Sequence, residues 1–185
     1  MRSITTAGFV AGVSVSGSHT FSKSERQSIT LLQGLGIEGD AHCGSTVQHL
    51  SDRKKDPTRP NLRQLHLIQS ELIEELNAMG FDVRPGDLGE NITTRQIDLP
   101  ALPQGALLQL GDTAIVKITG LRTPCSKIEK FQKGLRSAVT VHRNAGPPTL
   151  KRALLAIVVT GGLVSRDDRI VIHISGGPHR ALKPV

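Results

Sequence analysis

The sequence predicts an all-β fold, either a barrel or a sandwich, with a few short helices. Three observations support this class: many short apolar runs of β type, one clear amphipathic helix, and no alternation of strands with helices. A chain of 185 residues is long enough to bury a full core. We therefore expect a single domain over residues 1–185.

The predicted strands are bounded mostly by Gly, Pro or Asp. Residues 12–16 alternate apolar and polar side chains, as a half-buried strand does. The further runs lie at residues 28–32, 62–68, 106–110, 114–119, 154–159 and 169–174. Gly111 and Asp112 lie between two of these runs and predict a two-residue hairpin turn, and residues 163–171 predict a second hairpin.

One helix is predicted directly after Ser70, a residue type that caps helix N-termini. Acidic residues occupy its first turns, where the helix dipole favours negative charge, and Gly80 ends it. The apolar residues that recur at helical spacing are Leu72, Ile73, Leu76 and Met79. A shorter helix is predicted after Cys125, with Ile128 facing inward and Gly134 at its end.

Two segments are predicted to lack regular structure. Residues 49–61 are polar and contain prolines, which predicts a long loop, and long loops in compact domains are often functional. The tail, residues 176–185, is predicted to be flexible. The folded core is then expected over residues 5–175.

The formal net charge of +7 favours anionic partners. Proteins that bind single-stranded nucleic acid usually stack bases on aromatic side chains, whereas this chain has no Trp or Tyr and four Phe. The cations are also scattered, apart from residues 52–59. We therefore expect a phosphate-bearing small molecule rather than nucleic acid.

The sequence also predicts a cytoplasmic protein without membrane association. Its apolar runs are shorter than the roughly eighteen residues that a membrane span needs, and the N-terminus lacks the apolar stretch of a secretory signal. Two cysteines, Cys43 and Cys125, cannot make a disulfide framework, and we expect both to be reduced.

Two glycine-containing loops carry polar residues, and each has a structural alternative. Residues 36–49 either bring Asp40, His42 and His49 to one site or form a turn bonded to its own backbone, and the turn is favoured for this pattern alone. The spacing does not match a zinc finger. Residues 84–94 either present polar groups to a heterocycle or phosphate or lead into a strand, and the residues alone leave both open.

Cys125 lies between Arg122 and Lys127. Cationic neighbours and a following helix favour the thiolate, which attacks electrophiles and binds metals. The alternative is a buried, inert cysteine. A reactive thiol is favoured, but its electrophile or metal stays open, and no Cys-His order supports a protease mechanism.

Taken together, these motifs resemble the MOSC domain family, named after the C-terminal domain of molybdenum-cofactor sulfurases. The matching segments are GIEGDAHCG (36–44), PGDLGENITT (85–94) and RTPCSKIEKF (122–131). Residues 46–76 also resemble the linking segment of stand-alone bacterial members, so the resemblance spans about residues 5–175. It implies a closed, strand-rich β-barrel with short peripheral helices.

The resemblance implies that Cys125 is the functional sulfur. In reductases of the family that act on N-hydroxylated compounds, this cysteine coordinates the molybdenum of a molybdopterin cofactor. In a sulfurase-related role, it holds a persulfide. The cofactor contacts that it implies are Glu90, Asn91, Thr93, Thr94, Arg122 and Thr123.

Our leading hypothesis is a molybdenum-cofactor-dependent oxidoreductase with Cys125 as metal ligand. The cations of residues 52–63, Arg63 among them, are candidate anchors for the cofactor phosphate, and Asp40 or His42 is a candidate proton relay. A small-molecule substrate and a separate electron-donating reductase are expected, because the chain has no ferredoxin-like cysteine cluster. Purified protein need not retain the cofactor, and pyridoxal phosphate is not expected.

Two other hypotheses stay open. The first is a sulfur carrier that a cysteine desulfurase loads with a persulfide on Cys125. The second is a phosphate- or nucleic-acid-binding barrel with an inert Cys125, which ranks last. For Cys43, the possible roles are a spare metal ligand, a resolving cysteine or an incidental small residue, and the incidental role is favoured.

Overall fold

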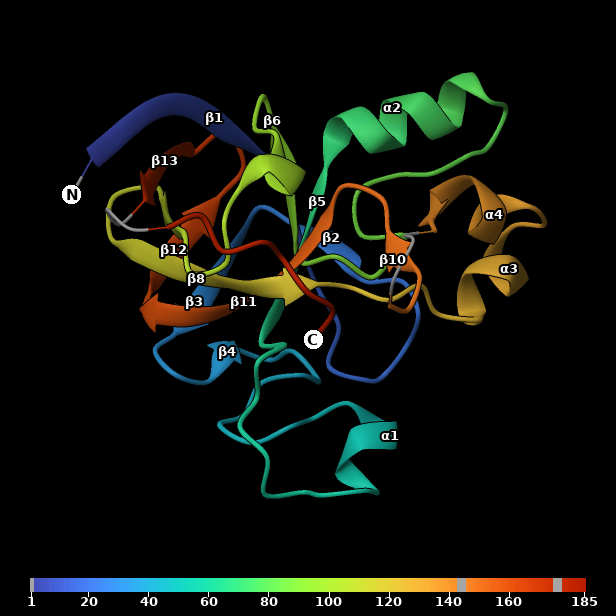
Figure 1. The fold of residues 1–185 in the computed structure, drawn as a ribbon, viewed down its shortest axis with the longest axis horizontal. Helices are drawn as coiled ribbons and strands as arrows, with labels where there is room; N and C mark the ends of the chain where they lie inside the picture. Colours follow the sequence, from blue (N-terminus) through green and yellow to red (C-terminus); the bar gives the residue numbers. More distant parts are fainter. Residues whose placement is uncertain (1, 143–145, 175–177) are drawn as a thin grey trace.

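Seven strands close into a barrel in the computed structural model, which describes residues 2–142, 146–174 and 178–185 (Figure 1). Around the barrel the order is β13, β7, β8, β11, β5, β6 and β1, and β1 pairs back with β13. Their bounds are β1 Arg2–Val15, β5 Leu65–Gln69, β6 Ile92–Arg95, β7 Leu107–Leu110, β8 Ala114–Leu121, β11 Ala153–Thr160 and β13 Arg169–Ile174. The closed barrel confirms the all-β fold predicted from the sequence.

The pairing of two barrel strands brings separate motifs together. β1 closes the barrel because it is long: its first half pairs with β13, and its second half pairs with β6 and with β2, Ser24–Arg26. β5 and β6 run parallel, with Leu67 paired with Ile92. This register sets His66 beside Asn91. The segment that follows the polar loop of residues 49–61 therefore lies against the second glycine loop, residues 84–94.

Aliphatic side chains fill the barrel, and a second apolar cluster lies outside its wall. Leu67 points into the barrel cluster, whereas its neighbour Ile68 belongs to the outer cluster, as the alternation of a strand requires. The outer cluster packs helices against the barrel through buried residues that include Leu72, Ile128 and Leu135. β5 is therefore buried on both faces.

The helices are short and peripheral, as predicted. They are α1 Leu50–Arg53, α2 Ser70–Ala78, α3 Lys127–Phe131 and α4 Leu135–Val139, with a 3-10 turn, η1, at Leu99–Ala101. α2, α3 and α4 lie on one side of the barrel, whereas α1 lies near the tip of a loop that extends away from it (Figure 1). In the described part of the chain, no helix is long and apolar enough to cross a membrane.

Two details of α2 differ from the prediction. Ser70 is the first helical residue, and Gln69 takes the N-cap position without a side-chain hydrogen bond. Met79 lies just after the last helical residue and is 59% exposed, so its predicted place on the apolar face is wrong.

The remaining strands form two small sheets. β3 Ser28–Leu32, β4 Gly36–Ile37 and β12 Gly162–Ser165 form one, and β9 Thr140–Val141 pairs with β10 Thr149–Leu150 in the other. The second predicted hairpin, at residues 163–171, is wrong, because β12 pairs with β3 while β13 pairs with β7 and β1. The first hairpin exists, but Leu110 pairs with Ala114, so its loop has three residues rather than two.

Two predicted irregular segments contain more structure than expected. The long loop of residues 49–61 includes α1. In the tail, residues 178–185 pack beside β8 instead of fraying: the Leu121 N–H donates to the Lys183 carbonyl at 2.8 Å. Gly120 permits this contact, because a Cβ there would lie 2.3 Å from the Lys183 oxygen. Residues 176 and 177 lie outside the described residues.

Candidate functional site

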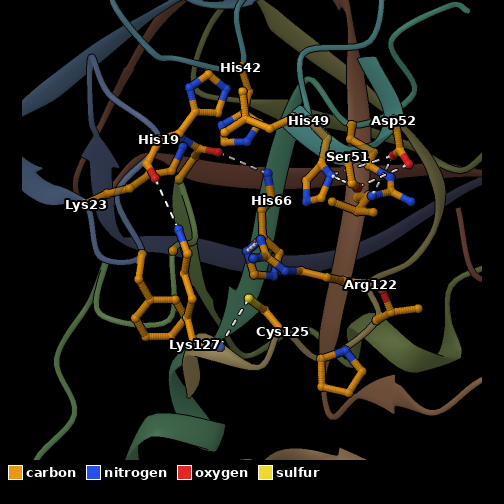
Figure 2. Close-up of a pocket in the computed structure, with 18 of the residues that line it drawn as sticks. His19, Lys23, His42, His49, Ser51, Asp52, His66, Arg122, Cys125 and Lys127 are labelled. Carbon is orange, nitrogen blue, oxygen red and sulfur yellow. Dashed lines mark hydrogen bonds and ion pairs between the residues drawn. The ribbon is translucent and has the colours of Figure 1, made fainter. Parts of the chain in front are cut away.

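A cavity of about 540 Å³ lies beside the end of β8 and is lined in part by Cys125 (Figure 2). Residues from 19–23, 42–52, 63–66 and 122–127 supply most of its wall. Small-molecule sites in proteins typically measure roughly 300–1,000 Å³. The charged and imidazole side chains in the wall are Lys23, Arg63, Arg122, Lys127, His19, His42, His49 and His66, with Asp52 as an acid. The wall is therefore strongly basic.

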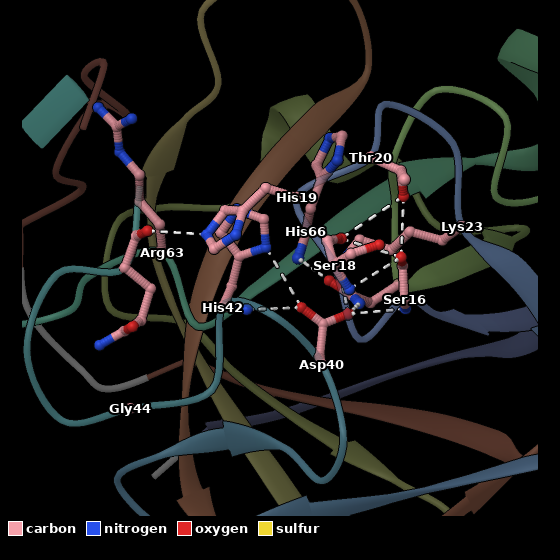
Figure 3. A network of polar contacts seen from close by, with 12 residues as sticks. Ser16, Ser18, His19, Thr20, Lys23, Asp40, His42, Gly44, Arg63 and His66 are labelled. Carbon is pink, nitrogen blue, oxygen red and sulfur yellow. Dashed lines mark hydrogen bonds and ion pairs between the residues drawn. The ribbon is translucent and has the colours of Figure 1, made fainter. Parts of the chain in front are cut away.

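Asp40 is the centre of a buried polar network (Figure 3). Its carboxylate accepts hydrogen bonds from Lys23 Nζ at 2.5 Å, Asn91 Nδ2 at 3.0 Å and the backbone N–H of His42 at 2.9 Å. Burial alone would raise its pKa, but the hydrogen bonds from His42 and the Lys23 ammonium hold the pKa well below its usual range. Asp40 therefore stays ionised near neutral pH and orients its neighbours, and its role as a proton relay stays a prediction.

Lys23 is a buried cation that the sequence pattern did not predict. Its side chain is 5% exposed, lines the cavity and pairs with Asp40. Burial lowers the pKa of Lys23, and Asp40 partly opposes this effect. In the sequence Lys23 lies in a short polar stretch, where a lysine usually faces solvent.

The second glycine loop packs directly against the segment that carries Lys23. Gly89 has a φ of +80°, and a Cβ there would lie 2.7 Å from the carbonyl oxygen of Phe21. Only glycine suits this backbone conformation and this close approach. The loop thus holds residues 19–23 against the barrel.

Three of the predicted cofactor contacts on this loop point inward. Glu90, Thr93 and Thr94 are buried, and none of them is among the residues that line the cavity. Glu90 Oε1 accepts hydrogen bonds from the Gly86 N–H at 2.7 Å and from Thr93 Oγ1 at 3.2 Å. Burial raises the pKa of Glu90. In this structure these side chains support the loop rather than face a ligand.

Asn91 does reach the cavity wall, but its amide is already engaged. Nδ2 donates to Asp40 and to the carbonyl of Ser14, and Oδ1 accepts the backbone N–H of His66 at 3.1 Å. Asn91 therefore connects β1, the first glycine loop and β5. Strand pairing brings these distant partners to Asn91.

His66 and Arg122 form a pair in the cavity wall. Arg122 Nη1 lies 2.7 Å from His66 Nδ1. Burial, followed by the Arg122 charge, lowers the pKa of His66 well below its usual range, so the imidazole is neutral. His66 was not predicted, although a histidine inside the apolar run of β5 is a buried polar group that needs a partner.

Cys125 lies between β8 and α3. Its Sγ accepts a hydrogen bond from the backbone N–H of Lys127 at 3.3 Å. Burial lowers the pKa of Arg122, and the nearby Cys125 sulfur opposes this effect. Figure 2 shows the sulfur pointing toward the His66–Arg122 pair. Among the described residues, no group of three or more His, Cys, Asp or Glu side chains is arranged to hold a metal ion.

Other predicted site residues differ in their placement. Thr123 and His42 line the cavity, and so does Arg63, whose Nη1 lies 3.3 Å from Asp52 of α1. The remaining cations proposed as phosphate anchors, within residues 53–59, are not among the residues that line it. The structure thus brings Cys125, Arg122, Thr123, His42, Asn91 and Arg63 to one cavity.

The barrel, the paired glycine loops and the cavity beside a thiol define a protein of the MOSC class. The family description "MOSC domain" matches residues 45–171, more than half of the chain, and the chain belongs to this family. The match confirms the resemblance seen in the motifs. The family is associated with the molybdenum cofactor.

Several solved structures share this fold. The chain is similar to the YuaD protein from Bacillus subtilis, with 23% identity and a TM-score of 0.73 over 94% of this chain and 100% of that chain. It is also similar to YiiM from Geobacillus stearothermophilus, with 16% identity and a TM-score of 0.64 over 94% of this chain and 79% of that chain. It is similar to YiiM from Escherichia coli as well, with 18% identity and a TM-score of 0.59 over 93% of this chain and 73% of that chain. Among curated proteins, no relative was found.

Proposed function

We propose that this protein binds the molybdenum cofactor in the cavity, with Cys125 as the protein ligand to the metal. We further propose that it is the catalytic component of a reductase that acts on N-hydroxylated compounds. The observation that carries the proposal is the position of Cys125 in a basic cavity of about 540 Å³ within a MOSC domain.

The residues present suit an anionic, sulfur-rich cofactor. Lys23, Arg63, Arg122 and Lys127 line the cavity and can bind a phosphate, while Asp52 is the acidic side chain in the wall. A thiolate is a soft ligand, which suits a metal that already has sulfur ligands.

The bound cofactor would supply the two-electron redox chemistry, and the chain would supply orientation, charge and protons. Arg122 would hold an anionic group beside Cys125. Phe21 and Leu155 would exclude water from that part of the cavity. His42 would accept or pass on a proton, because burial lowers its pKa and leaves it neutral near pH 7. Electrons would come from a separate reductase.

Metal and phosphorus analysis tests this proposal. The protein and its Cys125→Ala variant would be purified from cells that make the cofactor, with Cys43→Ala as the matched control. We expect near-stoichiometric molybdenum and phosphorus in the wild type and in the control, and a lowered molybdenum content in Cys125→Ala. A wild-type protein without molybdenum under these conditions would contradict the proposal.

A sulfur-carrier function is the second candidate, because the same contacts would stabilise a persulfide anion. The Lys127 N–H already donates to the Cys125 sulfur, and Arg122 lies near it. Incubation with a cysteine desulfurase and cysteine would then add the mass of one sulfur atom to the Cys125 peptide. Molybdenum-free protein that gains this mass would favour the carrier over the reductase.

A further inference from the structure

The end of strand β8 is held by the tail of the chain, residues 178–185. β7 pairs with β8 only as far as Lys117, so this edge of β8 has no barrel neighbour at Leu121. The tail takes that place. The Leu121 N–H donates to the Lys183 carbonyl at 2.8 Å, and the Val185 N–H donates to the Leu121 carbonyl at 3.2 Å. Covering an open strand edge with another segment is a common way to satisfy its backbone groups.

Three side-chain positions make this docking specific. Gly120 leaves room for the tail, because a Cβ there would collide with the Lys183 oxygen and with Val185 Cγ2. Leu182 is partly buried against the barrel cluster. Val185 is partly buried and lines the cavity. The tail is therefore packed on the barrel and reaches the edge of the candidate site.

The residue that follows Leu121 is Arg122, which lies in the cavity wall. Its Nη1 donates a hydrogen bond to His66 Nδ1 at 2.7 Å, and Figure 2 shows the Cys125 sulfur pointing toward this pair. The Arg122 carbonyl accepts the Leu150 N–H at 2.7 Å. The backbone that carries the guanidinium is thus held by the tail at Leu121 and by Leu150 at Arg122.

We propose that residues 182–185 are positioning residues: by holding Leu121, they hold Arg122 beside Cys125. Displacing the tail removes both of its hydrogen bonds to Leu121 and loosens the backbone next to Arg122. The cation then lies near the sulfur for less of the time, and the thiolate becomes less favoured. This inference rests on the proposed role of Cys125 as a reactive thiolate and adds a segment that no motif indicated.

Two variants displace the tail in independent ways, and each has a matched control. Gly120→Ala places a methyl group where the tail packs, whereas the Cβ added in Gly17→Ala meets nothing nearer than 3.5 Å. Leu182→Asp removes the apolar anchor of the tail and leaves β8 unchanged, and Ala181→Asp adds the same charge at the exposed neighbouring position. Hydrogen exchange at the Leu121 amide should become faster in both displaced variants and stay unchanged in both controls.

The rate at which iodoacetamide labels Cys125 is the first functional readout. Gly120→Ala and Leu182→Asp should each slow it about threefold near neutral pH, because Arg122 is loosened rather than removed. Easier access does not oppose this effect, since Cys125 is already partly exposed. Arg122→Met should slow the reaction more, and in that background neither tail variant should have a further effect.

Nitrogen NMR supplies a readout that a merely structural role would not move. In ¹⁵N-labelled protein, both displaced variants should move the His66 Nδ1 signal in the direction in which Arg122→Met moves it, because each weakens the same hydrogen bond. Unchanged labelling rates, a Leu121 amide that stays protected in both displaced variants, or equal slowing with and without Arg122 would overturn the proposal. Because these readouts need no molybdenum, they are independent of the metal analysis.

Discussion

The two cysteines of this chain have the same chemistry but contrasting surroundings. Cys125 lines the cavity, accepts a hydrogen bond from the Lys127 N–H and lies near the Arg122 guanidinium. Cys43 is partly buried and is not among the residues that line the cavity. Burial, followed by the charges of Asp40 and Glu38, raises the pKa of Cys43. The charged group beside Cys125 is a cation, whereas those beside Cys43 are carboxylates.

The comparison predicts that the charges around each thiol set its reactivity. Cys43 is sequence neighbour to His42, which does line the cavity. Although Asp40 is near both residues, only His42 reaches the cavity. The incidental role of Cys43 stays a prediction from the sequence.

The largest effect is expected when the buried ion pair between Asp40 and Lys23 is removed. Asp40→Asn would leave the buried Lys23 without its ion-pair partner, and removing one partner of a buried pair costs about 3–5 kcal/mol. Glu38→Gln, which changes the exposed carboxylate near Cys43, should alter stability by less than about 0.5 kcal/mol. Urea unfolding of both variants measures the difference, and a loss below about 1 kcal/mol in Asp40→Asn would show that the pair is not a structural requirement.

The same ion pair predicts a pH dependence of stability. Folding lowers the pKa of Asp40 from its ordinary value of 3.8, so the contribution of Asp40 is complete above that pH and is lost as the pH falls below it. In Asp40→Asn, the fall in unfolding free energy below pH 3.8 should be shallower than in the wild type. Equal slopes in the two proteins would contradict the assignment.

A smaller effect is expected from the cation beside Cys125. Iodoacetamide should label Cys125 before Cys43 near neutral pH, and Arg122→Met should slow Cys125 labelling about tenfold. Arg84→Met, which removes an exposed arginine, is the matched control and should leave the rate unchanged. Mass spectrometry of the two cysteine peptides over time gives both rates. Faster labelling of Cys43 than of Cys125 in the wild type would contradict the prediction that Cys125 is the more reactive thiol.

The smallest effect concerns Cys43 alone. Glu38→Gln removes one of the two carboxylates that raise its pKa, so Cys43 should react faster. Because Glu38 is exposed and its charge is screened, we expect a change of about twofold. The rate at Cys125 should stay the same in this variant.

Much of the fold followed from local patterns. The runs at residues 28–32 and 169–174 coincide with β3 and β13, because alternating or continuous apolar residues mark strands locally. The prediction of the second hairpin was wrong because strand pairing depends on contacts that are distant in sequence: β12 pairs with β3. The docked tail was missed because its contacts with Leu121 depend on how the barrel closes.

The candidate site residues that could be predicted from the sequence are those that belong to a motif. Cys125 and Arg122 belong to one short segment, and strand β8 delivers both to the cavity. Lys23 was missed because it lies in no motif, and His66 because the matching segment of residues 46–76 indicated no site residue. Their partners, Asp40 and Arg122, are distant in sequence. The 84–94 loop shows the converse, since Glu90 belongs to a motif and yet is buried away from the cavity.

Molybdenum K-edge X-ray absorption most directly tests whether Cys125 is the metal ligand. The wild-type protein, loaded in cofactor-producing cells, would be compared with Cys125→Ser and with Cys43→Ser. We expect one sulfur neighbour fewer at molybdenum in Cys125→Ser than in the wild type, and no change in Cys43→Ser. An unchanged sulfur count in Cys125→Ser would show that Cys125 is not the metal ligand.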